Sequence, residues 1–305
     1  MNTYNSHPRA MVLLVGEQPA PNLLPVRQTK PDVAALVHTD YTKHTAENLR
    51  RLLEPMCRCL LCEVDAYEIP LIRETMDRFL EEEIKEHSLL FNLTGGTKPM
   101  VLAAFDLAHR HGAPFVYMET KEGETILYTY SISEEGTIRL DRKEVLKESI
   151  TIDDYLRAYL GEYEVTGFSS GKGGAFERAV YEALKPYVDE VVAGVRKGGA
   201  LEIDLVLRCG NQIGIAEVKT GKAGRKKRPL EQLITASTRK FLGIHVRRFL
   251  ILSIGWDRGQ GNLRELAEAR GISVIELPHF GEADRLSEED RQRLVGKVLE
   301  RLGKK

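Results

Sequence analysis

Short apolar runs alternate with amphipathic stretches along the N-terminal part of the chain. The apolar runs cover residues 11–15, 33–37, 60–64, 89–93 and 115–118, and the stretches with helical spacing cover 22–28, 42–54, 70–86 and 99–111. Continuous apolar runs of this length are typical of strands that are buried on both faces, as in parallel sheets. The alternation therefore predicts a doubly wound α/β domain, closed by a hairpin over 125–131 and 137–140.

The C-terminal part has a different order of elements. The pattern predicts helices over 152–160, 175–186, 229–243, 262–270 and 287–302, and strands over 190–196, 248–254 and 273–277, with a β-hairpin within 202–219. Residues 162–174 are polar and rich in glycine, and we interpret them as a linker. We place the domain boundary after residue 166, which gives two α/β domains, 1–166 and 167–305. A chain of 305 residues is long enough for two hydrophobic cores.

The hairpin carries the clearest chemical pattern in the chain. Two β-runs flank a polar break at Gly210 and Asn211, which is typical of a tight turn. With the turn centred there, we expect Asp204 and Glu217 near the same end of neighbouring strands. Because strand side chains alternate, Glu217 and Lys219 point to the same face.

Two carboxylates and one ammonium at a strand end can hold a divalent cation and orient a water for phosphodiester hydrolysis. Asp204 and Glu217 are the candidate metal ligands, with the backbone carbonyl of Val218 as a further oxygen, and Lys219 is placed to position or polarise the water. The order resembles the D-x(n)-E-x-K core of PD-(D/E)xK nucleases. Those folds usually add an acidic residue on the preceding helix, and Glu177 has that place.

An isolated E-x-K on an amphipathic strand is usually a solvated face with a cross-strand ion pair, because short motifs have many false positives. The presence of all four residues in order, in a hairpin context, favours the nuclease interpretation.

The charge of the chain is divided unevenly between its halves. Residues 1–164 hold 18 Lys and Arg against 27 Asp and Glu, and residues 165–305 hold 26 against 18, so the net charges are −9 and +8. The basic half is the one expected to meet a polyanion. Directly after Lys219 comes a basic, glycine-containing loop, which is a candidate grip for nucleic-acid phosphates, although a solvated charge run is the alternative. Its basic residues are Lys222, Arg225, Lys226, Lys227 and Arg228.

Three polar loops follow strands of the N-terminal domain. They are residues 16–18, 39–43 and 94–98, and in a doubly wound fold they meet at the edge where ligands bind. The third loop, Thr-Gly-Gly-Thr-Lys, offers backbone N–H groups at a helix start, two hydroxyls and a lysine, which suit a phosphate or ribose. It is neither a Walker A loop nor a G-x-G-x-x-G fingerprint, so a purely structural turn remains the alternative.

Other features have ordinary explanations. The apolar run 11–15 is too short for a signal peptide and no stretch has membrane-spanning length, so we expect a cytoplasmic protein without membrane contact. Cys57, Cys59 and Cys62 lack a nearby fourth ligand, which favours buried thiols over a metal site. The single tryptophan, Trp256, follows a strand end, where packing is expected rather than base stacking.

Four segments together resemble the CRISPR ancillary nucleases that join a Rossmann-like CARF domain to a restriction-endonuclease-like domain. The first three are GEQPAPNLLP (16–25), HTDYTKHTAENL (38–49) and FNLTGGTKPM (91–100), and the fourth is the set of nuclease residues named above. The resemblance implies a homodimer that binds one cyclic oligoadenylate, usually cyclic tetra-adenylate, as activator. By motif position the ligand contacts are Gln18, Thr39, Asp40, Thr42, Thr94, Gly95, Gly96, Thr97 and Lys98.

The resemblance also implies a Mn²⁺- or Mg²⁺-dependent endonuclease that cuts or nicks DNA or RNA in type III CRISPR antiviral defence. Two alternatives stay open at this point. One is an activator-sensing regulator whose C-terminal half binds nucleic acid without cutting it. The other is a ring nuclease whose CARF loops degrade the activator.

Overall fold

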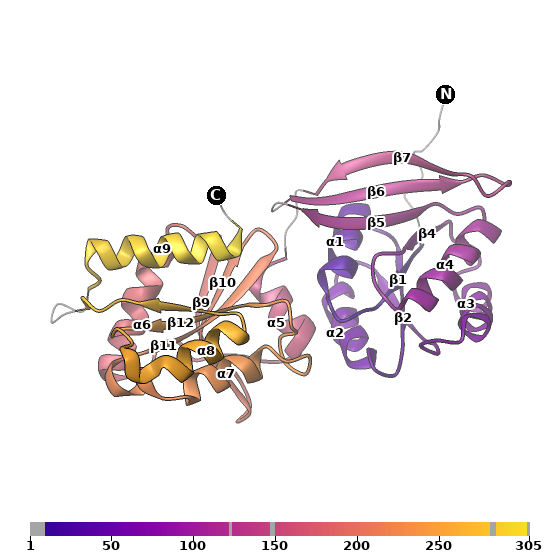
Figure 1. Ribbon diagram of the computed structural model, residues 1–305. Helices are drawn as coiled ribbons and strands as arrows, with labels where there is room; N and C mark the ends of the chain where they lie inside the picture. Colours follow the sequence, from indigo (N-terminus) through magenta and orange to yellow (C-terminus); the bar gives the residue numbers. More distant parts are fainter. Residues whose placement is uncertain (1–9, 122–123, 147–149, 281–284, 304–305) are drawn as a thin grey trace. The chain divides into compact units, whose positions relative to one another are not determined.

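The computed structural model describes residues 10–121, 124–146, 150–280 and 285–303 (Figure 1). The chain divides into two compact units, Met1–Ile150 and Thr151–Lys305, which we call the N-terminal and C-terminal units. This division falls earlier than the expected boundary after residue 166, because helix α5 (Ile152–Leu160) packs on strands of the second unit. Its Tyr155 hydroxyl donates to the carbonyl of Leu242 over 2.6 Å.

The N-terminal unit is built on a seven-stranded sheet in the order β3-β2-β1-β4-β5-β6-β7. Strands β1 to β5 are parallel, and β5, β6 and β7 form an antiparallel meander. The strands are β1 (Ala10–Leu14), β2 (Val33–His38), β3 (Arg58–Glu63), β4 (Leu89–Asn92), β5 (Phe115–Lys121), β6 (Glu124–Ile132) and β7 (Ile138–Val145), and the helices are α1 (Ala20–Thr29), α2 (Lys43–Leu53), α3 (Ile69–Glu83) and α4 (Lys98–Arg110).

The inner parallel strands β1, β2 and β4 are mostly apolar and buried because helices cover both faces of the sheet. Figure 1 shows α1 and α2 on one face and α3 and α4 on the other. Val12 and Leu14 of β1 pack with the α3 and α4 side, together with Ile72 and Met100. The predicted doubly wound α/β fold is confirmed, and the meander strands are longer than the sequence pattern indicated.

The C-terminal unit has a six-stranded sheet in the order β13-β12-β11-β10-β9-β8. Strands β8 to β11 pair antiparallel, and β11, β12 and β13 pair parallel. The strands are β8 (Glu164–Val165), β9 (Glu190–Lys197), β10 (Leu201–Cys209), β11 (Gln212–Lys219), β12 (Arg247–Leu252) and β13 (Ile272–Glu276), and the longer helices are α5, α6 (Gly171–Leu184), α7 (Arg228–Ala236), α8 (Gly261–Ala269) and α9 (Glu288–Leu302). The predicted hairpin is β10 and β11, with its turn at Gly210.

The core of this unit explains which side chains are left for chemistry. Leu205 of β10 and Ala216 and Val218 of β11 pack in the cluster that contains residues of α6 and α9. Because side chains alternate along a strand, Asp204 and Glu217 point to the opposite face.

Two element predictions in the C-terminal part were wrong. Residues 162–174 are not a continuous linker, since they contain β8 and the first residues of α6, which begins at Gly171. The helix predicted over 229–243 ends at Ala236, and residues beyond it form turns. Across the ranges that the structure describes, no helix combines the length and the apolar character that a membrane crossing needs.

Candidate functional site

The hairpin brings Asp204, Glu217 and Lys219 together at one end of the sheet. The Nζ atom of Lys219 lies 2.7 Å from Oδ2 of Asp204 and 2.7 Å from Oε1 of Glu217. The backbone N–H of Val218 donates to the same Oδ2 atom of Asp204 over 2.7 Å. The ladder between β10 and β11 pairs Leu205 with Ala216, so the next residues outward are Asp204 and Glu217, as the sequence predicted.

These charges are held away from water. The exposed fraction of the side chain is 2% for Glu217, 13% for Asp204 and 24% for Lys219. Burial raises the pKa of Glu217 to about 8, and the neighbouring charge of Asp204 adds to this effect. Burial likewise raises the pKa of Asp204, against the opposing charge of Lys219. For Lys219, burial acts to lower the pKa, but the charges of Glu217 and Asp204 outweigh it and raise that pKa.

Glu177 lies beside this group but is engaged elsewhere. It is buried on α6, and its charge contributes to the raised pKa of Asp204. Its Oε2 accepts a hydrogen bond from the Ser169 N–H over 2.9 Å, and its Oε1 accepts one from the Ser169 hydroxyl over 2.7 Å. The structure therefore places Glu177 near the site as a carboxylate that holds the segment before α6.

The donor set can be tested against a divalent cation. Asp204 and Glu217 supply hard oxygen ligands, and Oε1 of Glu217 is buried without a hydrogen bond of ordinary geometry. The oxygens that would hold a cation are the ones that now contact the Lys219 ammonium, so the residues fit a positive charge between the two carboxylates. Within the described ranges, no three or more His, Cys, Asp or Glu side chains are arranged as a metal group. A metal here would need backbone or water oxygens to complete its coordination.

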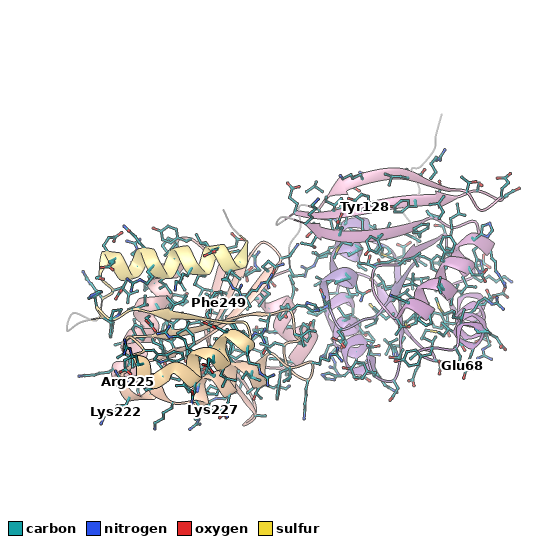
Figure 2. All side chains as sticks on the ribbon, in the orientation of Figure 1. Glu68, Tyr128, Lys222, Arg225, Lys227 and Phe249 are labelled. Carbon is teal, nitrogen blue, oxygen red and sulfur yellow. The ribbon has the colours of Figure 1, made fainter. Side chains whose placement is uncertain are left out.

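The predicted basic loop follows directly on this strand. It forms a short 3-10 helix, Gly221–Arg225, and the start of α7. All five basic side chains, Lys222, Arg225, Lys226, Lys227 and Arg228, are exposed. Figure 2 shows Lys222, Arg225 and Lys227 at the surface of the C-terminal unit. Two of the five are paired with carboxylates, Arg225 with Asp257 at 3.5 Å and Lys227 with Glu231 at 3.1 Å.

Trp256 fixes the backbone of the basic loop. The indole is 7% exposed, and its Nε1–H donates to the carbonyl of Gly224 over 2.8 Å. Gly224 is buried, and a Cβ on it would lie 2.8 Å from the side chain of Leu252. The guanidinium of Arg264 lies over the indole ring and bonds Glu276 at 2.7 Å. The packing role expected for Trp256 is confirmed, and its hydrogen bond to Gly224 holds the backbone of the basic loop.

In the N-terminal unit, the three predicted loops follow β1, β2 and β4, which are neighbours in the sheet. The loops after β1 and β4 touch through their backbones. A Cβ on Gly95 would lie 2.2 Å from the carbonyl oxygen of Leu14, and a Cβ on Gly16 would lie 3.2 Å from the nitrogen of Gly96. Gly96 has a positive φ of 74°. Glycine is therefore required here by close approach and by backbone conformation.

Most hydroxyls at this edge are already used within the protein. The Thr94 hydroxyl donates to Oδ1 of Asn92 over 2.6 Å and accepts from the Met118 N–H over 2.8 Å. The Thr97 hydroxyl donates to the carbonyl of Ala66 over 2.8 Å and caps α4 by accepting from the Met100 N–H. Thr94 and Thr97 thus serve first to order the loop.

Thr39 and Thr42 have the same structural character. Both are buried, their hydroxyls lie 3.3 Å apart, and each hydroxyl accepts the backbone N–H of the other residue. In contrast, Gln18, Asp40 and Lys98 are exposed. Of the predicted ligand residues, these three and the glycine backbones are the groups that a ligand can reach without breaking an internal bond.

Two residues of these sites were not predicted. Asn92 is fully buried, its Nδ2 donates to the carbonyl of Pro21 over 2.6 Å, and its Oδ1 fixes Thr94. The sequence signal that could have identified Asn92 is an asparagine at the end of an apolar run. Ser169 holds Glu177, and its position in a supposed linker concealed it. The cysteines behave as expected, since Cys57, Cys62 and Cys209 are buried free thiols and Cys59 is half-buried.

Comparisons with known proteins bear on the fold. A search of curated protein sequences finds no significant match. Among solved structures, the chain is similar to Can2 from Sulfobacillus thermosulfidooxidans in complex with cyclic tetra-adenylate, with a TM-score of 0.67, 17% identity and 97% of each chain covered. It is similar to protein VC1899 from Vibrio cholerae, with a TM-score of 0.68, 14% identity, and 95% of this chain and 97% of that chain covered.

A third similar structure is a type III CRISPR defence DNA nuclease activated by cyclic oligoadenylate. The TM-score is 0.64 at 16% identity, and the alignment covers 96% of this chain but 51% of that one. At these identities the likeness establishes a shared fold, and it extends over both units. Residues 10–155 match the family model described as the Card1 CARF domain. The N-terminal unit is therefore similar to the Card1 CARF domain, and a second α/β unit follows it, as the sequence predicted.

Proposed function

We propose that the protein is a nuclease that is activated by cyclic oligoadenylate and depends on a divalent metal, and that it acts in type III CRISPR defence. One observation carries the proposal. A buried pair of carboxylates, bridged by Lys219 at 2.7 Å to each, stands at the end of a hairpin in a unit that follows a CARF domain. Cyclic tetra-adenylate is the proposed activator, because the similar Can2 structure holds it, and a homodimer is the proposed assembly.

The proposed activator site is the edge formed by the loops after β1, β2 and β4. The backbone N–H groups of Gly95 and Gly96 lie before α4, where the helix dipole favours a negative charge. Lys98 is exposed at the first position of that helix and can pair with a phosphate. Thr39, Thr42, Thr94 and Thr97 shape the loops from within. Gln18 and Asp40 are exposed and suit hydrogen bonds to ribose or base.

The proposed cleavage site is the end of the hairpin. Asp204 and Glu217, with the carbonyl of Val218, would hold Mn²⁺ or Mg²⁺, which polarises a phosphate oxygen and lowers the pKa of a bound water. Once its two contacts are released, the Lys219 ammonium is placed to orient the attacking water and to offset charge on the phosphate. The basic loop is placed to hold the sugar–phosphate backbone of DNA or RNA, and Glu177 keeps the segment before α6 in place.

A regulator that binds nucleic acid without cutting it is the second candidate. The observation that favours the nuclease is the burial of Glu217. A binding surface needs no buried carboxylate, because burying a charge without a full set of partners is costly. The same feature separates the proposal from a ring nuclease that uses only the CARF loops.

The test is a cleavage assay on supercoiled plasmid and single-stranded RNA with Mn²⁺, with and without cyclic tetra-adenylate. We expect cleavage by the wild-type protein only when the activator is present. Glu217→Gln keeps the shape of the side chain and removes its charge, and it should reduce the rate by at least about a thousandfold. The matched control is Glu202→Gln on the neighbouring strand β10, whose exposed side chain pairs with Arg196 at 2.8 Å. It should cleave at the wild-type rate.

The outcomes separate the candidates. Tight activator binding without cleavage of either substrate would support the regulator. Cleavage that survives Glu217→Gln would remove the hairpin from the reaction. If the Glu217→Gln protein still degrades cyclic tetra-adenylate, the CARF domain carries out a second reaction.

A further inference from the structure

Four arginines gather where β12 and β13 begin. Arg247 and Arg248 are the first residues of β12, Arg270 caps the end of α8 just before β13, and Arg301 lies in the last turn of α9. We call Arg247, Arg248, Arg270 and Arg301 the arginine cluster. None of them belongs to the hairpin end or to the basic loop described above.

Two of these guanidiniums converge on Gly271. Nη2 of Arg301 donates to the carbonyl of Gly271 over 3.4 Å, and a Cβ on Gly271 would lie 3.5 Å from Nη2 of Arg248. Arg248 also donates through Nη1 to the hydroxyl of Ser237 over 3.2 Å, while its Nε is buried and has no hydrogen bond. Arg248 is thus half-buried next to another cation, with donor capacity to spare.

Among the described residues, no ion pair with a carboxylate neutralises any arginine of the cluster. Burial, followed by the charges of the other three arginines, lowers the pKa of Arg248. Some other arginines of the same unit are paired, such as Arg208 with Glu190 at 2.7 Å and Arg264 with Glu276 at 2.7 Å. The cluster contrasts with these paired arginines.

Helix ends compensate for part of this charge. The carboxyl ends of α7, α8 and α9 carry partial negative charge and favour cations nearby. That effect falls off within one turn and is smaller than a full charge, so it offsets only part of the positive charge of the four guanidiniums. Guanidinium groups bind the oxygens of a phosphate through paired N–H bonds. A phosphate-bearing anion would both neutralise the positive charge of the cluster and accept hydrogen bonds from its unused N–H donors.

We propose that the arginine cluster is a second contact site for the phosphate backbone of a nucleic-acid strand, at the other end of α7 from the basic loop. Helix α7 begins at Arg228 in that loop and ends at Ala236, beside the Ser237 that Arg248 contacts. Its nine residues span about 13 Å. Phosphates follow one another about every 3.4 Å along each strand of a duplex, so a strand of a few nucleotides reaches from the loop to the cluster. The inference rests on the proposed nucleic-acid substrate and extends its contact surface.

The test measures binding with cyclic tetra-adenylate present and without metal, so that the activated protein is probed and cleavage does not enter. Fluorescence anisotropy would follow a labelled DNA duplex of about 20 base pairs, and separately a single-stranded RNA of similar length, over a range of salt concentrations. We expect Arg301→Gln to weaken binding about three- to tenfold and to reduce the slope of log K against log salt by about 0.7 to 0.9. The matched control is Arg291→Gln on the same helix, whose arginine pairs with Glu288. It should leave both quantities unchanged.

A second variant separates binding from folding. Arg248→Met removes the half-buried charge and keeps most of the volume, so it should weaken binding while the melting temperature stays level or rises. If the wild-type protein binds the probes and both variants bind them equally tightly, the inference is wrong and the proposed function still stands. No binding of either probe by the wild-type protein would overturn both. If Arg301→Gln instead alters self-association in sedimentation while nucleic-acid affinity is unchanged, the cluster contacts acidic protein surface and the inference is wrong.

Discussion

The two candidate sites solve opposite electrostatic problems. At the edge of the CARF sheet, the hydroxyls of Thr39, Thr42, Thr94 and Thr97 are bonded inside the protein, and glycine backbones bring the loops together. At the end of the hairpin, Asp204 and Glu217 are buried, and Lys219 is the cation that contacts both of them. The hydrogen bonds of the first site are complete before a ligand arrives, whereas the second site holds two buried carboxyl groups against one ammonium.

Because of this difference, binding a ligand at the CARF edge and binding a cation at the hairpin end have different free-energy costs. A ligand at the CARF edge adds contacts to exposed groups such as Lys98 and disturbs no internal bond, so the site is preorganised. The proposed cation at the hairpin would take the carboxylate oxygens that Lys219 now contacts, which would free the ammonium for chemistry. We therefore expect ligand binding at the CARF edge to depend on backbone geometry. We expect stability and binding at the hairpin end to depend on the balance of charge.

The largest expected effect comes from removing the bridging cation. Lys219→Met leaves two buried carboxylates without their partner, and breaking a buried ion pair typically costs about 3–5 kcal/mol of folding free energy. Urea unfolding followed by fluorescence of Trp256, the single tryptophan, reports on the C-terminal unit. Mn²⁺ should restore much of this loss, because the metal supplies the missing positive charge, and it should bind this variant at least as tightly as the wild type.

The double variant Glu217→Gln/Lys219→Met is the matched test of charge balance. With one carboxylate removed, Asp204 keeps its hydrogen bond from the Val218 N–H, so the double variant should be more stable than Lys219→Met alone. Lys222→Met, which changes an exposed lysine in the adjacent loop, should unfold like the wild type. Equal stability of the double and single variants would show that charge balance does not govern this site.

The next effect tests backbone geometry at the CARF edge. A Cβ on Gly95 meets the carbonyl of Leu14 at 2.2 Å, so in Gly95→Ala the loops after β1 and β4 must separate. We expect a loss of about 2–3 kcal/mol in the N-terminal unit, and a loss of more than about tenfold in affinity for cyclic tetra-adenylate by titration calorimetry. Hydrogen exchange of the β1 and β4 amides would locate the damage.

Gly112→Ala is the control for strain alone. Gly112 has a φ of 57°, and a Cβ there meets nothing within 4 Å. It should lower stability by about 1 kcal/mol through its backbone conformation and leave activator affinity unchanged. If both variants lose affinity equally, contact between the two loops is not what shapes the site.

The fold was largely predictable because each buried strand is a separate apolar run. Residues 33–37 and 89–93 are bounded by polar turns, and the structure places β2 and β4 there. The weaker predictions were those with mixed signals. The glycines of 171–174 favour a loop, yet they form the first turn of α6, whose Phe176 and Val180 pack in the core. Tertiary packing overrides local propensity at such positions.

The sites were predictable to the extent that their residues lie on neighbouring strands. The register of one hairpin is enough to bring Asp204 to Glu217 and Lys219. Contacts that do not follow from strand pairing could not be obtained in this way, such as Thr97 to Ala66 or Ser169 to Glu177. The arginine cluster depends on three segments that meet only in the folded unit, and therefore no spacing in the sequence indicates it.

The smallest effect is expected at Lys98, and it sharpens the contrast between the sites. Lys98 is exposed, so Lys98→Ala should leave stability unchanged, unlike Lys219→Met. One charge-assisted contact to phosphate is worth about 1.5 kcal/mol, so affinity for cyclic tetra-adenylate should fall about tenfold, and the remaining binding should depend less on salt. Lys85→Ala, at an exposed lysine beyond the other end of the sheet, is the control. Unchanged affinity in Lys98→Ala would remove this lysine from the ligand contacts and leave the backbone amides and helix dipole to hold the phosphate.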